Sequence, residues 1–368
     1  MNILMTGLIY RNSKPHLRSR HAYFPSLTVL ANGDLLCGFD VGSAFESDDV
    51  RNHHSVSKDG GMTWGTPELT PAPESVAPFF SSCRFKTAPS GELVGAGALW
   101  DRSRSEEGLA NPETGGFVDT TLFIVRGDRA AHTWQAPSTV DPPLRGPFEI
   151  CSPLFFAANG EWLWPMSVLK NWEGHVEHGM RAIVLRSDNK GATWKEWSPV
   201  MDESSQGLVF WEIKLSQMSD GRIAALCWTH DTNAGCDLPV HYAISSDNGR
   251  SFSPPRSTGL LGQTCTPLAL SNGKIICFYR RSDHQGLWAQ VAVLDGEVWR
   301  NEEEMLLWSG ASHSPGNLTA PKFATDTMSG LRFGLPTAVC LPDQSVLAAF
   351  WCVEDAVANI RYFKISLP

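Results

Sequence analysis

The chain has 368 residues, of which 42% are hydrophobic and 19% charged, and its formal net charge at pH 7 is -9. This composition supports a large buried core, and the acidic balance argues against nucleic acid as the main partner. No apolar run of about 18 residues predicts a membrane span, and the first residues do not resemble a signal peptide. Nine scattered cysteines fit reduced thiols better than disulfides, so we expect a cytoplasmic protein. No Cys/His spacing predicts a metal, and no cofactor is expected.

Six hairpin patterns follow one another along the chain. In each pattern a short apolar strand leads through a tight turn into a second apolar strand, as Asn-Gly and Asp-Gly favour. The turns are Asn32-Gly33, Ser90-Gly91, Asn159-Gly160, Asp220-Gly221, Asn272-Gly273 and Asp343-Gln344. Their spacing suits propeller blades, which hold four strands in roughly 40 to 70 residues. We therefore predict an all-β, six-bladed β-propeller that forms one domain over residues 1–368.

The opening segment, residues 2–10, also has the pattern of a strand. A propeller protects its sheet edges best when the ring is closed. We therefore expect this segment to complete the last blade.

A short turn motif recurs along the chain. It reads S-K-D-G-G-M-T-W at Ser57–Trp64, S-D-N-K-G-A-T-W at Ser187–Trp194 and S-S-D-N-G-R-S-F at Ser245–Phe252. The acidic or amide side chain can bond backbone amides, and glycine supplies backbone angles closed to other residues. The motif is similar to the Asp-box (BNR repeat) of the sialidase-like, or neuraminidase-like, superfamily of β-propellers. This resemblance implies that the turns lie on the outer rim and stabilise the fold, which does not fix a function.

The resemblance also implies where an axial pocket should lie. Sialidases carry a Glu eight residues before the fourth-blade turn, and Glu212 stands there in this chain. Tyr23 occupies the position of a first-blade Arg, Trp228 that of a second Arg, and Leu335 that of the nucleophilic Tyr. The chain therefore resembles a divergent member without the usual arginine triad and nucleophile. A sialic acid clamp needs bidentate Arg groups, which Tyr and Trp cannot replace.

A pair of carboxylates is the usual machinery of glycoside hydrolysis. Glu212 is the first candidate, because a carboxylate near the axis costs energy unless it is paired or used. Asp48 and Asp49, in the loop of the first blade, and Glu149, near the start of the third, are the candidate partners. The residues predicted to bind the substrate are Arg20, Tyr23, His54, Trp228, His230, Arg280 and Arg281.

The predicted function is an exo-acting glycoside hydrolase that removes a terminal sugar, acidic sugars included, from an oligosaccharide. One alternative is a lyase, in which Tyr23, His54 or His230 would abstract a proton beside a uronic acid carboxylate and Arg20 would neutralise that carboxylate. A second alternative is a carbohydrate-binding propeller without turnover, against which the carboxylate of Glu212 counts. Neither nucleic acid nor a membrane is an expected partner.

Overall fold

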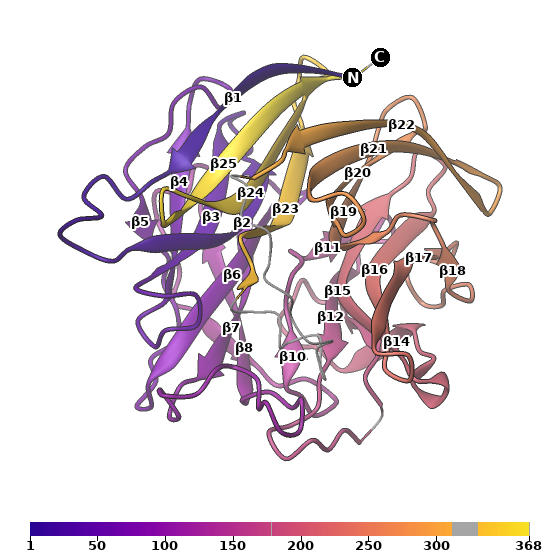
Figure 1. Ribbon diagram of the computed structural model, residues 1–368, viewed down its shortest axis with the longest axis horizontal. Helices are drawn as coiled ribbons and strands as arrows, with labels where there is room; N and C mark the ends of the chain where they lie inside the picture. The colour runs from indigo at the N-terminus through magenta and orange to yellow at the C-terminus, as the bar shows by residue number, and fades with distance from the viewer. Residues whose placement is uncertain (178, 311–329, 368) are drawn as a thin grey trace.

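The structure is a computed structural model that describes residues 1–177, 179–310 and 330–367. Six antiparallel sheets are arranged around a central axis (Figure 1). The helical element named within the described residues is the 3₁₀ turn η1 (Ser204–Gln206). No helix of the described residues is long and apolar enough to cross a membrane. The predicted six-bladed, all-β propeller is therefore confirmed.

Each blade is one sheet whose strands follow one another outward from the axis. The strands of the first three blades are β2 (His21–Val29), β3 (Leu35–Gly42), β4 (Arg51–Ser57), β5 (Glu68–Leu69); β6 (Phe79–Thr87), β7 (Leu93–Asp101), β8 (Thr120–Gly127), β9 (Ser138–Val140); β10 (Phe148–Glu149), β11 (Phe155–Phe156), β12 (Trp162–Val168), β13 (Ala182–Ser187) and β14 (Glu196–Met201). The strands of the next two are β15 (Leu208–Gln217), β16 (Ile223–Asp231), β17 (Cys236–Ser245), β18 (Arg256–Ser257); β19 (Gly262–Ala269), β20 (Ile275–Arg281), β21 (Gly286–Asp295) and β22 (Val298–Trp308). The last blade comprises β23 (Phe333–Cys340), β24 (Val346–Glu354), β25 (Val357–Ser366) and β1 (Asn2–Tyr10).

The two ends of the chain meet in the last blade. Strand β1 pairs antiparallel with β25, with Asn2 opposite Ser366 and Gly7 opposite Tyr362. Gly7 is required there, because a Cβ at this position would lie 2.8 Å from the Tyr362 ring. The prediction that residues 2–10 close the ring is confirmed, and the two termini lie together in Figure 1.

The predicted hairpin turns lie between the first and second strands of their blades. In five blades the second turn residue is a glycine with a positive φ, such as 90° at Gly33 and 88° at Gly221. The sixth turn uses Gln344, with φ 65°. Positive φ is freely accessible to glycine alone, so the recurrence of Gly at this position follows from the turn geometry.

The recurrent turn motif adopts one hydrogen-bonded conformation in three blades. The hydroxyls of Ser57, Ser187 and Ser245 each accept the N–H of the glycine four residues later, at 2.9, 2.9 and 2.8 Å. In the same way the side-chain oxygen of Asp59 accepts the N–H of Thr63 at 2.9 Å. These turns join the third and fourth strands, so they lie at the same end of the blades as the hairpin turns. The opposite end carries the longer loops.

The core lies between neighbouring blades. Strands β3 and β12 are buried at every position, because both faces of these sheets are covered by adjacent blades. Trp164, Phe39 and Phe350 are among the largest fully buried side chains. This packing fixes the inner strands, and with them the side chains that face the axis.

Candidate functional site

Four blades carry the same irregularity in the strand nearest the axis. In β2, β15, β19 and β23 the register shifts at a β-bulge, eight residues before the hairpin turn. The bulged residues are Phe24, Glu212, Thr264 and Leu335, with φ of 53°, 52°, 52° and 41°. Such left-handed angles cost on the order of 1–3 kcal/mol for residues other than glycine, and bulges re-aim side chains, often at active sites.

Counting back eight residues from the other two hairpin turns gives Ser82 and Cys151. Strand β6 runs through Ser82 without a bulge, and Cys151 lies in the gap between β10 and β11. Both line the same axial cavity as Phe24, Glu212 and Leu335. The eight-residue offset was thus a signal that could have identified Ser82 and Cys151, which the sequence analysis missed.

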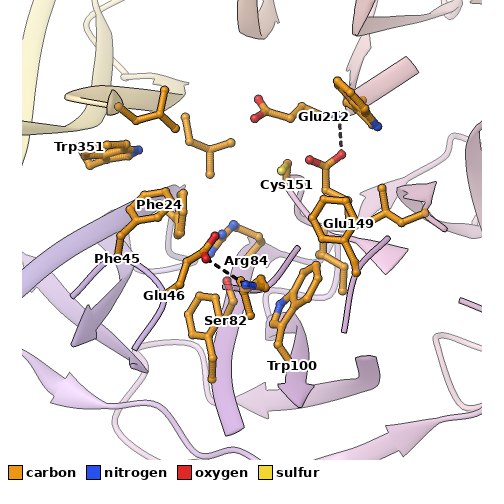
Figure 2. Close-up of a pocket in the computed structure, with 18 of the residues that line it drawn as sticks. Phe24, Phe45, Glu46, Ser82, Arg84, Trp100, Glu149, Cys151, Glu212 and Trp351 are labelled. Carbon is orange, nitrogen blue, oxygen red and sulfur yellow. Dashed lines mark hydrogen bonds between the residues drawn. The ribbon is translucent and has the colours of Figure 1, made fainter. Parts of the chain in front are cut away.

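The cavity has a volume of about 140 Å³ and draws its walls from all six blades. Its surface is mainly apolar, and it includes the rings of Phe24, Phe45, Phe80, Trp100, Phe117, Trp211, Trp228 and Trp351. Figure 2 shows Phe24, Phe45 and Trp351 on one wall, facing Glu149, Cys151 and Glu212 on the other. The site therefore combines apolar ring faces with a few convergent polar groups, as small-molecule sites do.

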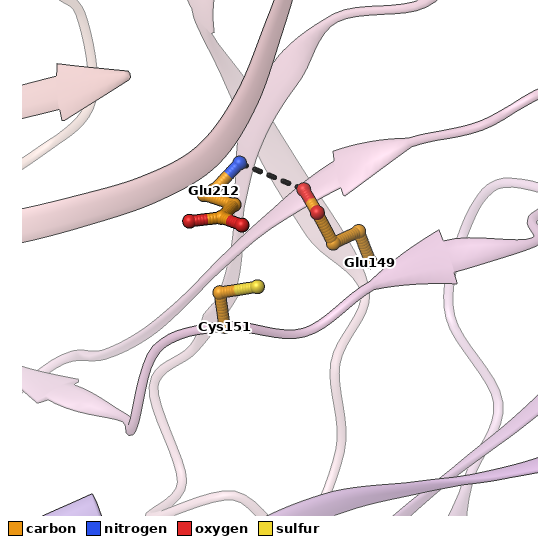
Figure 3. Close-up of side chains that lie close together, drawn as sticks. All are labelled: Glu149, Cys151 and Glu212. Atoms are coloured by element: carbon orange, nitrogen blue, oxygen red, sulfur yellow. Dashed lines mark hydrogen bonds between the residues drawn. The ribbon is translucent and has the colours of Figure 1, made fainter. Parts of the chain in front are cut away.

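Two carboxylates form the polar wall. The carboxylate Oε2 of Glu149 accepts the backbone N–H of Glu212 at 2.7 Å (Figure 3). One oxygen of each carboxylate and the Cys151 Sγ all lie within 4.8 Å of one another. Burial, and then the charge of Glu212, raise the pKa of Glu149 to about 7. The protonated form of Glu149 is therefore favoured relative to an ordinary carboxyl group, while the buried Oε2 of Glu212 has no hydrogen-bond partner among the described residues.

A third carboxylate, Glu46, reaches the cavity from the loop between β3 and β4. Its Oε2 accepts the N–H of Leu109 at 2.9 Å, and burial raises its pKa. The sequence analysis had selected Asp48 and Asp49 from this loop, but both are exposed and neither lines the cavity. The path of the loop, which no pattern predicts, brings Glu46 inward.

Asp49 has a structural role in that loop instead. Its carboxylate accepts hydrogen bonds from the backbone and hydroxyl of Ser43 and from the hydroxyl of Ser47. Partial burial raises the pKa of Asp49, but these hydrogen bonds outweigh it and lower the pKa below its usual value.

Two guanidinium groups line the cavity, Arg84 and Arg280. Arg280 donates from Nε to Gln263 Oε1 at 3.0 Å and from Nη1 to the Phe333 carbonyl at 2.9 Å. Arg84 is 3% exposed and donates to the fully buried Asp40 at 3.4 Å. Arg280 was predicted; Arg84 was missed, because it lies six residues before its turn, outside the counted position.

Four of the predicted site residues meet in this cavity: Glu149, Glu212, Trp228 and Arg280. The seven others do not line it: Arg20, Tyr23, Asp48, Asp49, His54, His230 and Arg281.

His230 and Tyr23 lie directly behind the wall. His230 Nδ1 and the Trp228 indole N–H both contact Asp237 Oδ1 at 2.8 Å, and the His230 ring stacks on Trp211. Tyr23 packs against Trp351 with ring centroids 5.3 Å apart, and burial raises its pKa above its usual value.

Besides Asp48 and Asp49, three more predicted residues lie farther out. His54 is buried beside Trp134 in the third strand of its blade, where burial lowers its pKa to about 4. Arg281 pairs with Asp283 and Glu304 at 2.7 and 2.8 Å. Arg20 is exposed before β2.

Comparisons with known proteins agree on the architecture. No family model and no curated protein matches the chain. A protein of unknown function from Dyadobacter fermentans is 21% identical, with a TM-score of 0.74 over 100% of this chain and 99% of that one. The NanB sialidase from Streptococcus pneumoniae is 12% identical, with a TM-score of 0.68 over 98% of this chain and 70% of that one. The chain shares the propeller fold of these structures.

The same fold extends to a further glycosidase. An α-L-arabinanase from Penicillium chrysogenum is 15% identical, with a TM-score of 0.69 over 100% of this chain and 99% of that one. At these identities the likeness establishes the sialidase-like fold alone, so the argument for function depends on the cavity.

Within the described residues, Glu149, Cys151 and Glu212 are the group whose ligand atoms lie close enough to hold a metal ion. Carboxylate and thiolate are a donor set that Zn²⁺ accepts. However, burial and the two carboxylates raise the pKa of the Cys151 thiol, which favours its protonated form. The two carboxylates are therefore better suited to acid–base chemistry.

Proposed function

We propose that this protein is a glycoside hydrolase that removes a terminal sugar from an oligosaccharide. The observation that carries the proposal is the pair Glu149 and Glu212 on one wall of a cavity that is otherwise mainly apolar. The proposal also draws support from the fold, since the similar structures include a sialidase and an arabinanase.

The two carboxylates have different environments, as an acid and its partner require. With a pKa of about 7, Glu149 is the group that donates a proton to the leaving oxygen. Glu212 then acts as the carboxylate that attacks the anomeric carbon or activates water. A retaining hydrolase needs its carboxyl groups about 5–5.5 Å apart and an inverting one about 6.5–9.5 Å. Side-chain oxygens within 4.8 Å of each other favour the retaining arrangement.

The charge of the cavity favours an uncharged sugar. Three carboxylates, Glu46, Glu149 and Glu212, face two guanidinium groups. One of the two, Arg84, is already engaged by Asp40. Even with Glu149 protonated as the acid, Glu46 and Glu212 outnumber Arg280, so an anionic sugar would meet an excess of negative charge, whereas hydroxyls can donate to the carboxylates. The sequence-based prediction included acidic sugars, whereas the charge of the cavity favours uncharged ones.

The shape of the cavity favours action at a chain end. Its small volume suits one sugar ring, and the rings of Trp228 and Trp351 offer apolar faces to the C–H groups of a sugar. Leu335 lines the wall at the position where the sialidase resemblance implies a nucleophilic Tyr. We therefore assign the attacking carboxylate to Glu212 and propose an activity other than that of a sialidase.

The lyase alternative has less support. Among the described residues no His or Tyr lines the cavity, so a carboxylate would have to serve as its base. A cytoplasmic location remains part of the proposal, consistent with the nine cysteines, all of which are free thiols.

The experiment is a screen of aryl glycosides and short neutral oligosaccharides with the wild type and the Glu212→Gln variant. We expect hydrolysis by the wild type and a loss of about 10²–10⁴-fold in kcat/KM for the variant. Asp48→Asn is the matched control, because Asp48 lies outside the cavity, and it should retain full activity. Measurable sugar binding without turnover would instead support a carbohydrate-binding propeller.

A further inference from the structure

A second cavity lies on the same axis, on the side of the hairpin turns. It has a volume of about 450 Å³ and is lined by the innermost strands of all six blades. One lining residue from each blade is Ser26, Lys86, Pro153, Ser216, Thr266 and Thr337. Arg84 and Cys151 line both cavities, so the two are neighbours along the axis. Arg84 is seen from the side of the first cavity in Figure 2.

This second cavity is basic. Three cations line it, Arg84, Lys86 and Lys214, and among the described residues no carboxylate does. The lysine ion pairs of the described chain involve Lys274 and Lys364, and neither Lys86 nor Lys214 takes part in one. Two ammonium groups therefore share a cavity without a carboxylate partner.

Lys214 is the more buried of the two lysines, so its charge costs more free energy. Its side chain is buried, with 6% of the residue exposed, and Nζ donates to Thr266 Oγ1 at 2.9 Å and to the Pro336 carbonyl at 3.3 Å. An ammonium group has three N–H donors, so one is left for a further partner. Burial lowers the pKa of Lys214 and the nearby charge of Glu212 offsets this only in part, so an anion beside Nζ would stabilise the ammonium form.

Arg84 is a second buried cation with an unused hydrogen-bond donor. It is 3% exposed, and its Nε has no hydrogen-bond partner among the described residues. Its Nη1 is used by Asp40 and by the Cys83 carbonyl. A buried donor of this kind normally has an acceptor, and here the space beside it is a cavity.

We propose that this axial cavity binds a small oxyanion, such as inorganic phosphate, sulfate or a simple carboxylate. Lys86 and Lys214 would neutralise its charge, and the unused N–H groups of Lys214 and Arg84, with the hydroxyls of the cavity, would donate to its oxygens. The site adjoins the carboxylate cavity, with which it shares Arg84 and Cys151, but it does not depend on the proposed hydrolase activity.

The test measures the thermal unfolding midpoint and the binding heat of the wild type with inorganic phosphate at constant ionic strength. The expected result is a saturable rise of Tm with phosphate concentration and a matching dissociation constant by calorimetry. Lys86→Gln should weaken phosphate binding about tenfold or more, because a charged hydrogen bond is lost. The exposed Lys195 serves as the matched control, and Lys195→Gln should bind phosphate as the wild type does.

Two results would overturn the proposal. One is a Tm that rises without saturation and equally in all variants, since salts that are excluded from protein surfaces act in this way. The other is unchanged phosphate affinity in Lys86→Gln and also in Lys214→Met, provided that the latter folds. Sulfate and acetate should compete with phosphate; chloride that competes equally well would contradict an oxyanion site.

Discussion

Replacing Glu149 with Gln should change how the stability of the protein depends on pH. Burial and the charge of Glu212 raise the pKa of Glu149 from its ordinary value of 4.5 to about 7. Below pH 4.5 the carboxyl is protonated in the folded and unfolded chains alike, and no penalty arises. As the pH rises to about 7 the unfolded chain ionises first, so the wild type progressively loses stability.

The size of this loss follows from the pKa difference. About 2.5 pH units, at about 1.4 kcal/mol for each unit, give an upper limit of about 3–4 kcal/mol. Since Glu149 keeps some contact with solvent, we expect a loss of about 1–3 kcal/mol. The variant cannot ionise at this position and should escape the loss, while its amide oxygen can still accept the N–H of Glu212.

The assay is urea unfolding of the wild type, Glu149→Gln and the exposed control Glu106→Gln between about pH 4 and pH 8. The variant should gain stability relative to the wild type as the pH rises, and Glu106→Gln should follow the wild type. Parallel curves for Glu149→Gln and the wild type would refute the assignment of a raised pKa.

Three further predictions concern the cavity and the rim. The kcat/KM of the proposed hydrolysis should fall as the pH rises through about 7, because Glu149 must be protonated to donate; a pH–rate profile that stays flat up to pH 9 would contradict this role. Glu46→Gln should lower kcat/KM by about tenfold or more, because the cavity wall loses a carboxylate. Asp49→Asn should lower stability alone, because Asp49 bonds within its own loop. Equal kcat/KM values for the two variants would show that Glu46 is not part of the site. Asp247→Ala should destabilise the protein by about 1–2 kcal/mol, because it removes hydrogen bonds from Ser245 and Ser251, and should leave kcat/KM within about twofold; a large loss of activity without a shift in Tm would be inconsistent with a rim role.

The fold was predictable from the sequence because its determinants are local. Glycine at the second turn position, as at Gly33 and Gly221, follows from a positive φ that each hairpin needs. The closing strand at residues 2–10 could be predicted because an open ring would expose a sheet edge. The repeated turn motif depends on hydrogen bonds within a few residues, so its conformation is encoded where it stands.

The site was predictable where it follows the strand repeat. Glu212 was predicted from the sialidase resemblance, which implies a Glu eight residues before the fourth-blade turn, and the same distance marks Ser82 and Cys151. Glu46 could not be placed in this way, because the loop between β3 and β4 has no periodicity, and its neighbours Asp48 and Asp49 point outward. His54 and His230 fit the pattern of polar site residues, but His230 packs behind the cavity wall and His54 lies farther out in the third strand of its blade; both are buried, as histidines often are in part.

The measurement that tests the central claim most directly is mass spectrometry of the products formed from a panel of neutral oligosaccharides in heavy-oxygen water. The account predicts that the wild type releases a terminal sugar with the heavy oxygen at its new reducing end, and that Glu212→Gln releases almost none. An unsaturated, unlabelled product, or equal release by the variant, would contradict a hydrolase whose chemistry depends on the Glu149–Glu212 pair.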